Sequence, residues 1–236
     1  MSFLIAVHVN EGIVLASDRR TTYSQTSNEN GQQVVKFGVH TTNSTDKTFV
    51  CPNGAGISSC GDASLLGKPI TGYIQEMIRS GISAGTKTSD ISQIIIDYFY
   101  GMPTVPNSSF IVAGYDAVED KKVQKLFKVR LADKNIEEIN TDSQGASWDG
   151  ETLTLARLIQ DVGIKGNDGN YIPLPFEEIA WNYYTLQDAI DFARFAVEAT
   201  IKTMHFKNVV ETVGGNVDIL VITPEETKWI QKEELR

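Results

Sequence analysis

The sequence predicts an α+β protein, a four-layer αββα sandwich with two largely antiparallel sheets. Three observations lead to this prediction. Segments with the period-2 alternation of β-strands follow one another across short turns, which is typical of hairpins and antiparallel sheets. Helical segments interrupt them, so the order is strands, two helices, strands, two helices, strands. Two sheets that share one apolar face, each with helices on its other face, satisfy this order.

Length and composition fit one domain over residues 1–236. A hydrophobic content of 41% is enough for a substantial core, and no linker or internal repeat divides the chain. The net charge of −9 without a basic cluster argues against nucleic acid and membrane-surface partners. The sequence has neither an apolar run of about 18 residues nor a secretory signal at its start, so we expect a cytoplasmic protein.

Cysteine and histidine are too sparse for a disulfide scaffold or a metal centre. The chain has two cysteines, and its three histidines are far apart in sequence. It contains no CxxC and no HExxH motif. We therefore expect no metal and no other cofactor.

In the first half of the chain, alternating patterns predict strands on both sides of a polar, turn-rich stretch at 18–33. The predicted strands cover residues 3–9, 13–17, 34–40, 47–51 and 55–59. A helix is expected at 60–81, where Pro69 either kinks it or opens it. A second helix is expected at 89–102, capped by Ser89 or Asp90.

The second half repeats this order. Strands are predicted at 108–116, 121–133, 134–142, 216–223 and 227–235. Helices are predicted at 150–162 and 185–204, and Thr185 with Asp188 has the spacing of a capping box. Residues 163–178 are expected to form an internal loop rather than a domain boundary.

Several motifs resemble the proteasome β-subunit and HslV family, which includes the bacterial proteasome-like group called Anbu. The motifs are "IAVHVNEGIVLASDRRTT", "DKTF", "CGDAS" and "GGNVDILVIT", and they occur in the family's order over nearly the whole chain. The resemblance implies the fold of N-terminal-nucleophile (Ntn) hydrolases, in which the first residue of the mature chain attacks an amide bond. Counting back from Asp18 puts Ser2 at that position, directly after an initiator methionine of the kind that is normally removed.

The resemblance assigns a catalytic role to each residue around Ser2. A serine hydroxyl needs an adjacent base, and a free α-amino group with a pKa of about 7.7–8.0 can act as one. Lys47 of "DKTF" matches the family's lysine, whose ammonium favours the unprotonated amine, and Asp18 holds that lysine. The backbone N–H of Ser58 matches the family's oxyanion donor. The resemblance places the substrate pocket at Thr21, Gly56 and Cys60.

Some positions depart from the family's pattern. The family begins with threonine, and its serine of a "GSG" motif corresponds here to "QGASWDG", where we expect Ser147 rather than Ala146 to take that place. The family's aspartate and serine before "GG" correspond to Val210 and Val213, which cannot do a polar task. The segment 25–46 is longer than usual, so matching Lys47 requires an insertion.

The same residues also allow structural interpretations. Asp18 could cap a turn or pair with Arg20, and Lys47 could be a solvated lysine at a strand edge. Further structural interpretations are a small buried residue for Cys60, a helix N-cap for Asp62 and a strand residue between sheets for His8.

The preferred function is a proteasome-like peptidase that cleaves peptide or unfolded-protein substrates inside a large homo-oligomer, with an ATPase partner left open. The alternatives are a catalytically silent assembly subunit and an Ntn amidohydrolase for a small amide. Subunit contacts are expected on the helices, at exposed apolar positions such as Ile94, Ile95 and Tyr98. Both enzymatic interpretations require the loss of Met1, and the silent subunit does not.

Overall fold

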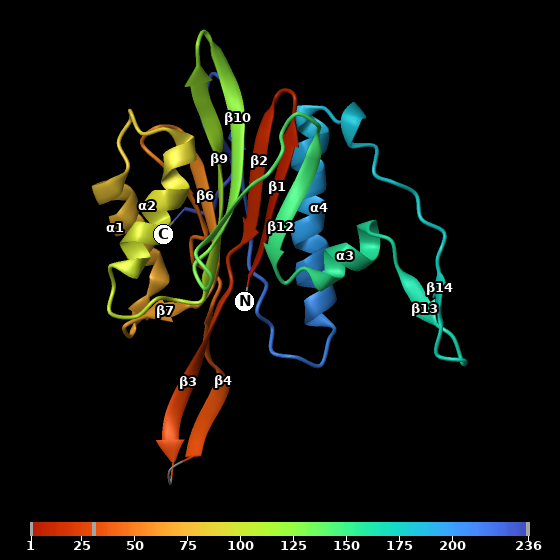
Figure 1. Ribbon diagram of the computed structural model, residues 1–236. Helices are drawn as coiled ribbons and strands as arrows, with labels where there is room; N and C mark the ends of the chain where they lie inside the picture. The colour runs from red at the N-terminus through yellow and green to blue at the C-terminus, as the bar shows by residue number, and fades with distance from the viewer. Residues whose placement is uncertain (1, 30–31, 235–236) are drawn as a thin grey trace.

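The chain is an α+β protein built around two five-stranded antiparallel sheets (Figure 1). The structure is a computed structural model that describes residues 2–29 and 32–234. The expected removal of Met1 lies outside the described residues. The first sheet has the order β12-β1-β2-β15-β16 and the second β11-β10-β9-β6-β5. The α+β class and the antiparallel pairing predicted from the sequence are confirmed.

The N-terminal hairpin is the centre of the first sheet. Its strands β1 (Phe3–Val9) and β2 (Gly12–Asp18) are buried at every position, because both faces of this sheet are covered. Strand β12 (Gly145–Gly150) flanks β1 with Phe3 opposite Gly150. Strands β15 (Val217–Ile222) and β16 (Thr227–Gln231) complete the sheet beyond β2.

The second sheet contains the strands that border the N-terminus. Its strands are β5 (Thr48–Val50), β6 (Gly56–Gly61), β9 (Ser108–Val118), β10 (Lys121–Arg130) and β11 (Asn135–Glu138). The two sheets share an apolar core in which Leu4, Leu15 and Leu220 meet Ile111, Ala113 and Leu126. This shared core fixes the start of β1 against the second sheet.

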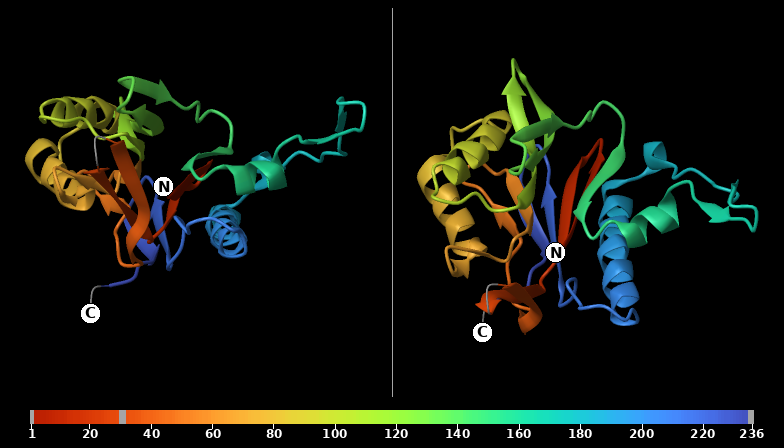
Figure 2. Two further views of the ribbon diagram at one scale, coloured as in Figure 1. Left: turned by 90° about the horizontal axis from the view of Figure 1, so that it is seen from below. Right: turned by 60° about the horizontal axis from the view of Figure 1, so that its bottom comes forward.

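Helices cover the outer face of each sheet (Figures 1 and 2). Helices α1 (Ile70–Gly81) and α2 (Thr88–Tyr100) pack on the second sheet through a cluster that includes Met77 and Ile91. Helices α3 (Leu153–Ile159) and α4 (Leu186–His205) pack on the first sheet, where Val197 belongs to the cluster. No helix within the described residues is long and apolar enough to cross a membrane.

The helix predicted at 60–81 is shorter than expected. Strand β6 runs through Gly61, and a small hairpin of β7 (Ser64–Leu65) and β8 (Lys68–Pro69) precedes α1. Pro69 is the N-cap residue, since its fixed φ suits the entry to a helix. Asp62 is not a cap, because its carboxylate accepts the Asn107 N–H at 2.8 Å on the neighbouring chain segment.

Two other helices are capped by residues at very different distances along the sequence. The capping box of Thr185 and Asp188 at α4 is confirmed. The predicted cap of α2 by Ser89 or Asp90 is wrong. The Asp116 carboxylate of β9 accepts the Thr88 and Ser89 N–H groups at 2.6 and 3.2 Å.

Two segments expected as turns or loops form hairpins. The stretch 18–33 contains all of β3 (Thr21–Glu29), which pairs with β4 (Gln32–Thr42) in a hairpin that projects from the body (Figure 1). The loop 163–178 contains the hairpin β13 (Gly163–Lys165) and β14 (Tyr171–Pro173), and the short helix η1 (Trp181–Tyr183) follows. Both hairpins are polar or mixed in sequence, so the apolar alternation of buried strands is weak in them.

The apolar α2 residues that were expected to be exposed pack against the protein's own core. Ile95 is fully buried, and Ile94 and Tyr98 pack against the same core cluster. These three residues therefore give no support for a subunit interface.

Candidate active site

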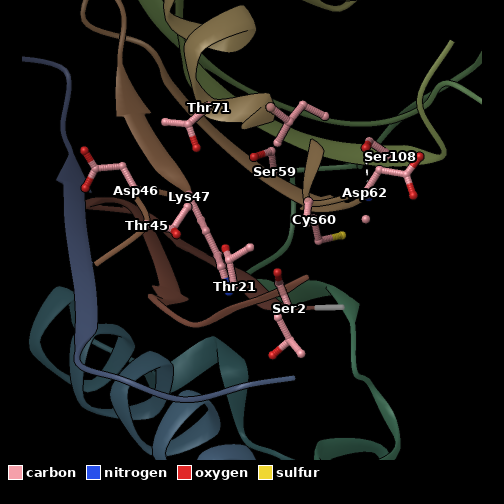
Figure 3. Close-up of a pocket in the computed structure, with 14 residues that line it drawn as sticks. Ser2, Thr21, Thr45, Asp46, Lys47, Ser59, Cys60, Asp62, Thr71 and Ser108 are labelled. Atoms are coloured by element: carbon pink, nitrogen blue, oxygen red, sulfur yellow. Dashed lines mark hydrogen bonds between the residues drawn. The ribbon is translucent and has the colours of Figure 1, made fainter. Parts of the chain in front are cut away.

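A small cavity lies where β1 begins, between the N-terminal end of the first sheet and strand β6 of the second. Its volume is about 30 Å³, and its wall includes Ser2, Thr21, Thr45, Lys47, Ser59 and Cys60. Figure 3 shows Ser2, Thr21, Lys47 and Cys60 around the same space. The chain thus brings together residues predicted from motifs that are far apart in sequence.

Asp18, the last residue of β2, joins the parts of the site. One carboxylate oxygen, Oδ1, accepts the Phe3 N–H at 3.0 Å and the Lys47 ammonium at 2.7 Å. The other oxygen, Oδ2, accepts the N–H groups of Arg20 at 3.1 Å and Gly214 at 2.9 Å. Asp18 is fully buried, and these four donors offset the cost of removing its charge from water.

Lys47 is a buried lysine immediately before β5, and is not the solvated edge lysine of the structural interpretation. Its side chain is 4% exposed and pairs with Asp18. Burial lowers the pKa of the Lys47 ammonium, and the Asp18 carboxylate opposes part of this shift. The Lys47 ammonium thus shares an Asp18 oxygen with the Phe3 N–H, beside the start of β1.

Ser2 is fixed by the end of strand β12. Its carbonyl oxygen accepts the Glu151 N–H at 2.8 Å, and the residue is 7% exposed. Gly150 has φ +89°, and a Cβ atom at this position would lie 1.9 Å from the Ser2 carbonyl oxygen. Only glycine fits such a close approach at this backbone conformation.

Cys60 lines the cavity as a neutral thiol. It is 9% exposed, and burial raises the pKa of the thiol to about 12. A thiol with so high a pKa is a poor nucleophile at neutral pH. Cys60 thus has the burial expected of a small structural residue and also contributes to the cavity wall.

Besides Asp18, three predicted site residues lie outside the cavity wall. Ser58 is fully buried in the middle of β6, and its hydroxyl shares a hydrogen bond of 2.8 Å with that of Thr48. Gly56 belongs to the core between the sheets, because a Cβ there would lie 2.7 Å from a methyl group of Leu15. Ser147 pairs with Ala6, further along β1 than Ser2.

Several residues that shape the site are not indicated by the sequence motifs. Gly150 positions Ser2, and Gly214 supplies a backbone donor to Asp18. Arg19 binds the segment before Lys47 through the Ser44 carbonyl and the Asp46 carboxylate. The "DRR" and "GG" motifs contain two of these residues, but nothing in sequence shows which segments they meet.

The positions matched to the family's polar pair differ in environment. Val213 is buried in the core cluster beneath α4, and Val210 is 47% exposed. Glu211, between them, pairs with Arg20, and its other carboxylate oxygen accepts a hydrogen bond from the His205 ring at 2.9 Å. Within the described residues, no group of His, Cys, Asp and Glu side chains could hold a metal ion.

Comparison with known proteins gives structural matches only. No family model and no curated protein sequence matches the chain. Anbu from Hyphomicrobium sp. strain MC1 superposes with a TM-score of 0.57 at 14% identity, covering 98% of this chain and 88% of that one. The chain has the fold of Anbu.

Two further Anbu structures give the same result. The Gly-1 mutant of the Hyphomicrobium protein matches with a TM-score of 0.60 at 13% identity, covering 99% of this chain and 86% of that one. Anbu from Yersinia bercovieri, described as an ancestral β-subunit, matches with a TM-score of 0.55 at 12% identity over 98% and 88% of the two chains. The proteasome-like resemblance seen in the sequence motifs is confirmed at the level of the fold. At identities this low a shared fold does not establish a shared reaction, which has to be argued from the site residues.

Proposed function

We propose that the chain is a proteasome-like Ntn peptidase with Ser2 as its nucleophile after removal of Met1. The observation that supports this most is the double contact of Asp18. A single carboxylate oxygen binds the Phe3 N–H, next to Ser2, and the Lys47 ammonium. This contact supports a role for Lys47 as the buried cation beside the residue that the sequence register marks as the nucleophile.

The reaction follows from the chemistry of an N-terminal serine. The Ser2 hydroxyl attacks the carbonyl carbon of the scissile amide, and its proton passes to the free α-amino group. That proton then goes to the leaving amine, and an ester remains on Ser2. Water hydrolyses the ester with the same amine as base. The Lys47 charge disfavours protonation of the amine and so keeps it available near neutral pH.

The oxyanion donor needs a backbone N–H that points into the cavity. The Ser59 N–H donates to the Lys47 carbonyl at 2.8 Å, and successive N–H groups of a strand point to opposite edges. The Ser58 N–H therefore faces β9, which does not favour its predicted role. Gly61 lines the cavity. Its N–H points to the same edge of β6 as the Ser59 N–H, the edge that faces β5, and lies beyond the first residue of β5. Gly61 is the better candidate donor.

Labelling with a peptide vinyl sulfone tests the proposal. Chains that lack Met1 are expected to gain one adduct on Ser2, located by peptide mass spectrometry. Ser2→Ala removes the hydroxyl and keeps the amine, so it should lose both the adduct and hydrolysis. Ser2→Thr should keep both, since its hydroxyl occupies the same place. An adduct on Cys60 instead of Ser2, or equal hydrolysis by chains that retain Met1, would contradict the mechanism.

A catalytically silent assembly subunit is the second candidate. Val210 and Val213 offer no polar group at the positions matched to the family's aspartate and serine. Intact mass separates the two candidates, because a chain that keeps Met1 has an amide in place of the basic amine. Retention of Met1 in every chain would favour the silent subunit.

A third candidate is an amidohydrolase for a small amide. The cavity beside Ser2 has a volume of about 30 Å³, which leaves little room for a large acyl side chain. Relative rates on a short acyl amide and on an unfolded protein distinguish this candidate from the peptidase.

The wider architecture also belongs to this proposal. The sheets and helices form one four-layer αββα domain over residues 1–236, and copies of the chain assemble into a large homo-oligomer. A cytoplasmic location and an ATPase partner stay predictions.

A further inference from the structure

A buried cluster of charged residues lies behind the cavity wall. Arg19 is 1% exposed and Asp218 is fully buried, and they are joined by a hydrogen bond of 2.7 Å. The same guanidinium nitrogen, Nη1, donates to Asp46 Oδ1 at 2.8 Å. A buried guanidinium requires such partners, because an unpaired charge in this place would be strongly destabilising.

Arg19 holds the three residues that precede Lys47. Its Nη2 donates to the Ser44 carbonyl at 3.2 Å, and its own carbonyl accepts the Thr45 N–H at 3.1 Å. With the bond to Asp46, every residue of 44–46 is bound to Arg19. Thr45 and Asp46 also line the cavity, so this contact fixes both the wall and the backbone that leads into Lys47.

The C-terminal segment completes the cluster. Lys232, just beyond β16, donates to Asp46 Oδ1 at 2.6 Å and to Asp218 Oδ2 at 3.1 Å. The Glu233 N–H donates to Asp218 Oδ1 at 3.3 Å, and the Glu233 carboxylate lies 3.7 Å from Arg19 Nε. The Lys232 ammonium also lies 4.5 Å from the centre of the Trp229 ring. The last part of the described chain is thus bound to the segment that positions Lys47.

We propose that Arg19, Asp218 and Lys232 are positioning residues for Lys47, and that the C-terminal segment supports the active-site wall from behind through Asp46. Asp18 binds the Lys47 ammonium, and the adjacent Arg19 binds the backbone before Lys47. Loss of any one partner loosens segment 44–46 and moves the Lys47 charge. The catalytic consequence rests on the proposed function, whereas the mobility of Lys47 does not.

Acylation of Lys47 measures its accessibility without any assay of activity. Native chains are treated briefly with acetic anhydride, and the extent of modification at Lys47 is read by peptide mass spectrometry. Lys232→Met and Asp218→Asn are expected to raise the rate at Lys47 about tenfold, as local opening becomes easier when a buried charge pair is broken. Lys228→Met is the matched control, because Lys228 is on β16 and pairs with the exposed Glu226, outside the buried cluster.

Arg19→Lys tests the geometry of the guanidinium. Lysine keeps the charge but cannot bind Asp46, Asp218 and the Ser44 carbonyl together, so Lys47 should be acylated faster in Arg19→Lys than in the unchanged chain. If this variant does not fold, Lys232→Met decides the question, since Lys232 is 22% exposed and its loss leaves Arg19 paired.

The pH dependence of hydrolysis gives the second readout. In the proposed mechanism the Lys47 charge disfavours protonation of the Ser2 amine, so its displacement should move the acid limb of kcat/KM to higher pH in Lys232→Met. Unchanged acylation of Lys47 in Lys232→Met and Asp218→Asn would overturn the inference. If no chain hydrolyses peptide, the proposed function fails, and the acylation result still decides the role of the cluster.

Discussion

At the scale of single residues, Asp18 has the widest effect on the site. Its carboxylate binds donors from four chain segments, at Phe3, Arg20, Lys47 and Gly214. Three of these donors are backbone N–H groups, which a side-chain substitution at Lys47 leaves in place. The buried carboxylate therefore stays hydrogen-bonded even when its cation is lost.

Lys47→Ala should abolish hydrolysis and still allow folding. The three remaining N–H donors stabilise Asp18, so we expect a loss on the order of 3 kcal/mol in the free energy of unfolding. Lys47→Arg should not restore activity, because the wide guanidinium places its charge differently. Steady-state rates and urea denaturation measure both effects. Full activity of Lys47→Ala at neutral pH would exclude the proposed role.

The two cysteines predict the response of the fold to alkaline pH. Burial raises the pKa of Cys51 and of Cys60 from the ordinary value of 9.0 to about 12. Above pH 9.0 the unfolded chain loses thiol protons that the folded chain keeps, so the free energy of unfolding should fall as pH rises toward 12. The Cys51→Ala, Cys60→Ala double variant should show a weaker fall in urea denaturation over this range. An identical slope in both proteins would contradict this assignment.

At the scale of elements, the end of β12 determines where β1 begins. Gly150 stands opposite Phe3, and the next residue donates its N–H to the Ser2 carbonyl. Ser2, the proposed nucleophile, is thus positioned by a neighbouring strand, even though it precedes the first strand of the chain.

Gly150→Ala should displace Ser2 and destabilise the fold. The new Cβ would lie 1.9 Å from the Ser2 carbonyl oxygen, at a backbone φ of +89° that alanine disfavours. Gly169→Ala is the control, because Gly169 has φ +85° and open space around its Cβ position. The control should lose about 1 kcal/mol from backbone strain alone, and Gly150→Ala at least about 3 kcal/mol. Equal losses in urea denaturation would show that the contact with Ser2 does not matter.

At the scale of the whole molecule, large apolar side chains remain exposed away from the helix expected to form contacts. Phe37 is 73% exposed on the projecting β3–β4 hairpin, and Tyr171 is 71% exposed on β14. Tyr183 and Phe206 are each 86% exposed. Apolar surface on protruding hairpins is typical of association surfaces.

The chain should therefore sediment as a large homo-oligomer. Phe37→Ser with Tyr171→Ser is expected to shift the distribution toward smaller species, because these side chains contribute no core contact. Tyr98→Phe is the control within the α2 cluster and should leave assembly unchanged. A stable monomer of 26.0 kDa at micromolar concentration would contradict this prediction.

The sequence by itself determined the features that depend on neighbours along the chain. The order of strands and helices follows from local periodicity, and the α4 capping box joins residues only three positions apart. The register from Ser2 to Asp18 spans one hairpin, so the motif was enough to bring the two together. The fold class could be predicted for the same reason.

The tertiary structure alone decided the contacts between distant segments. The cap of α2 comes from Asp116, 28 residues after Thr88, and Gly214 binds Asp18 across 196 residues. Arg19 and Asp218 are separated by 199 residues, and nothing near either one in sequence indicates the pairing. Gly56 and Ser58 appeared to be site residues by motif, but the side on which each group of β6 points depends on its pairing with β5 and β9. A strand reverses its exposed face with each residue, so only the packed sheets determine which side chains and N–H groups reach the cavity.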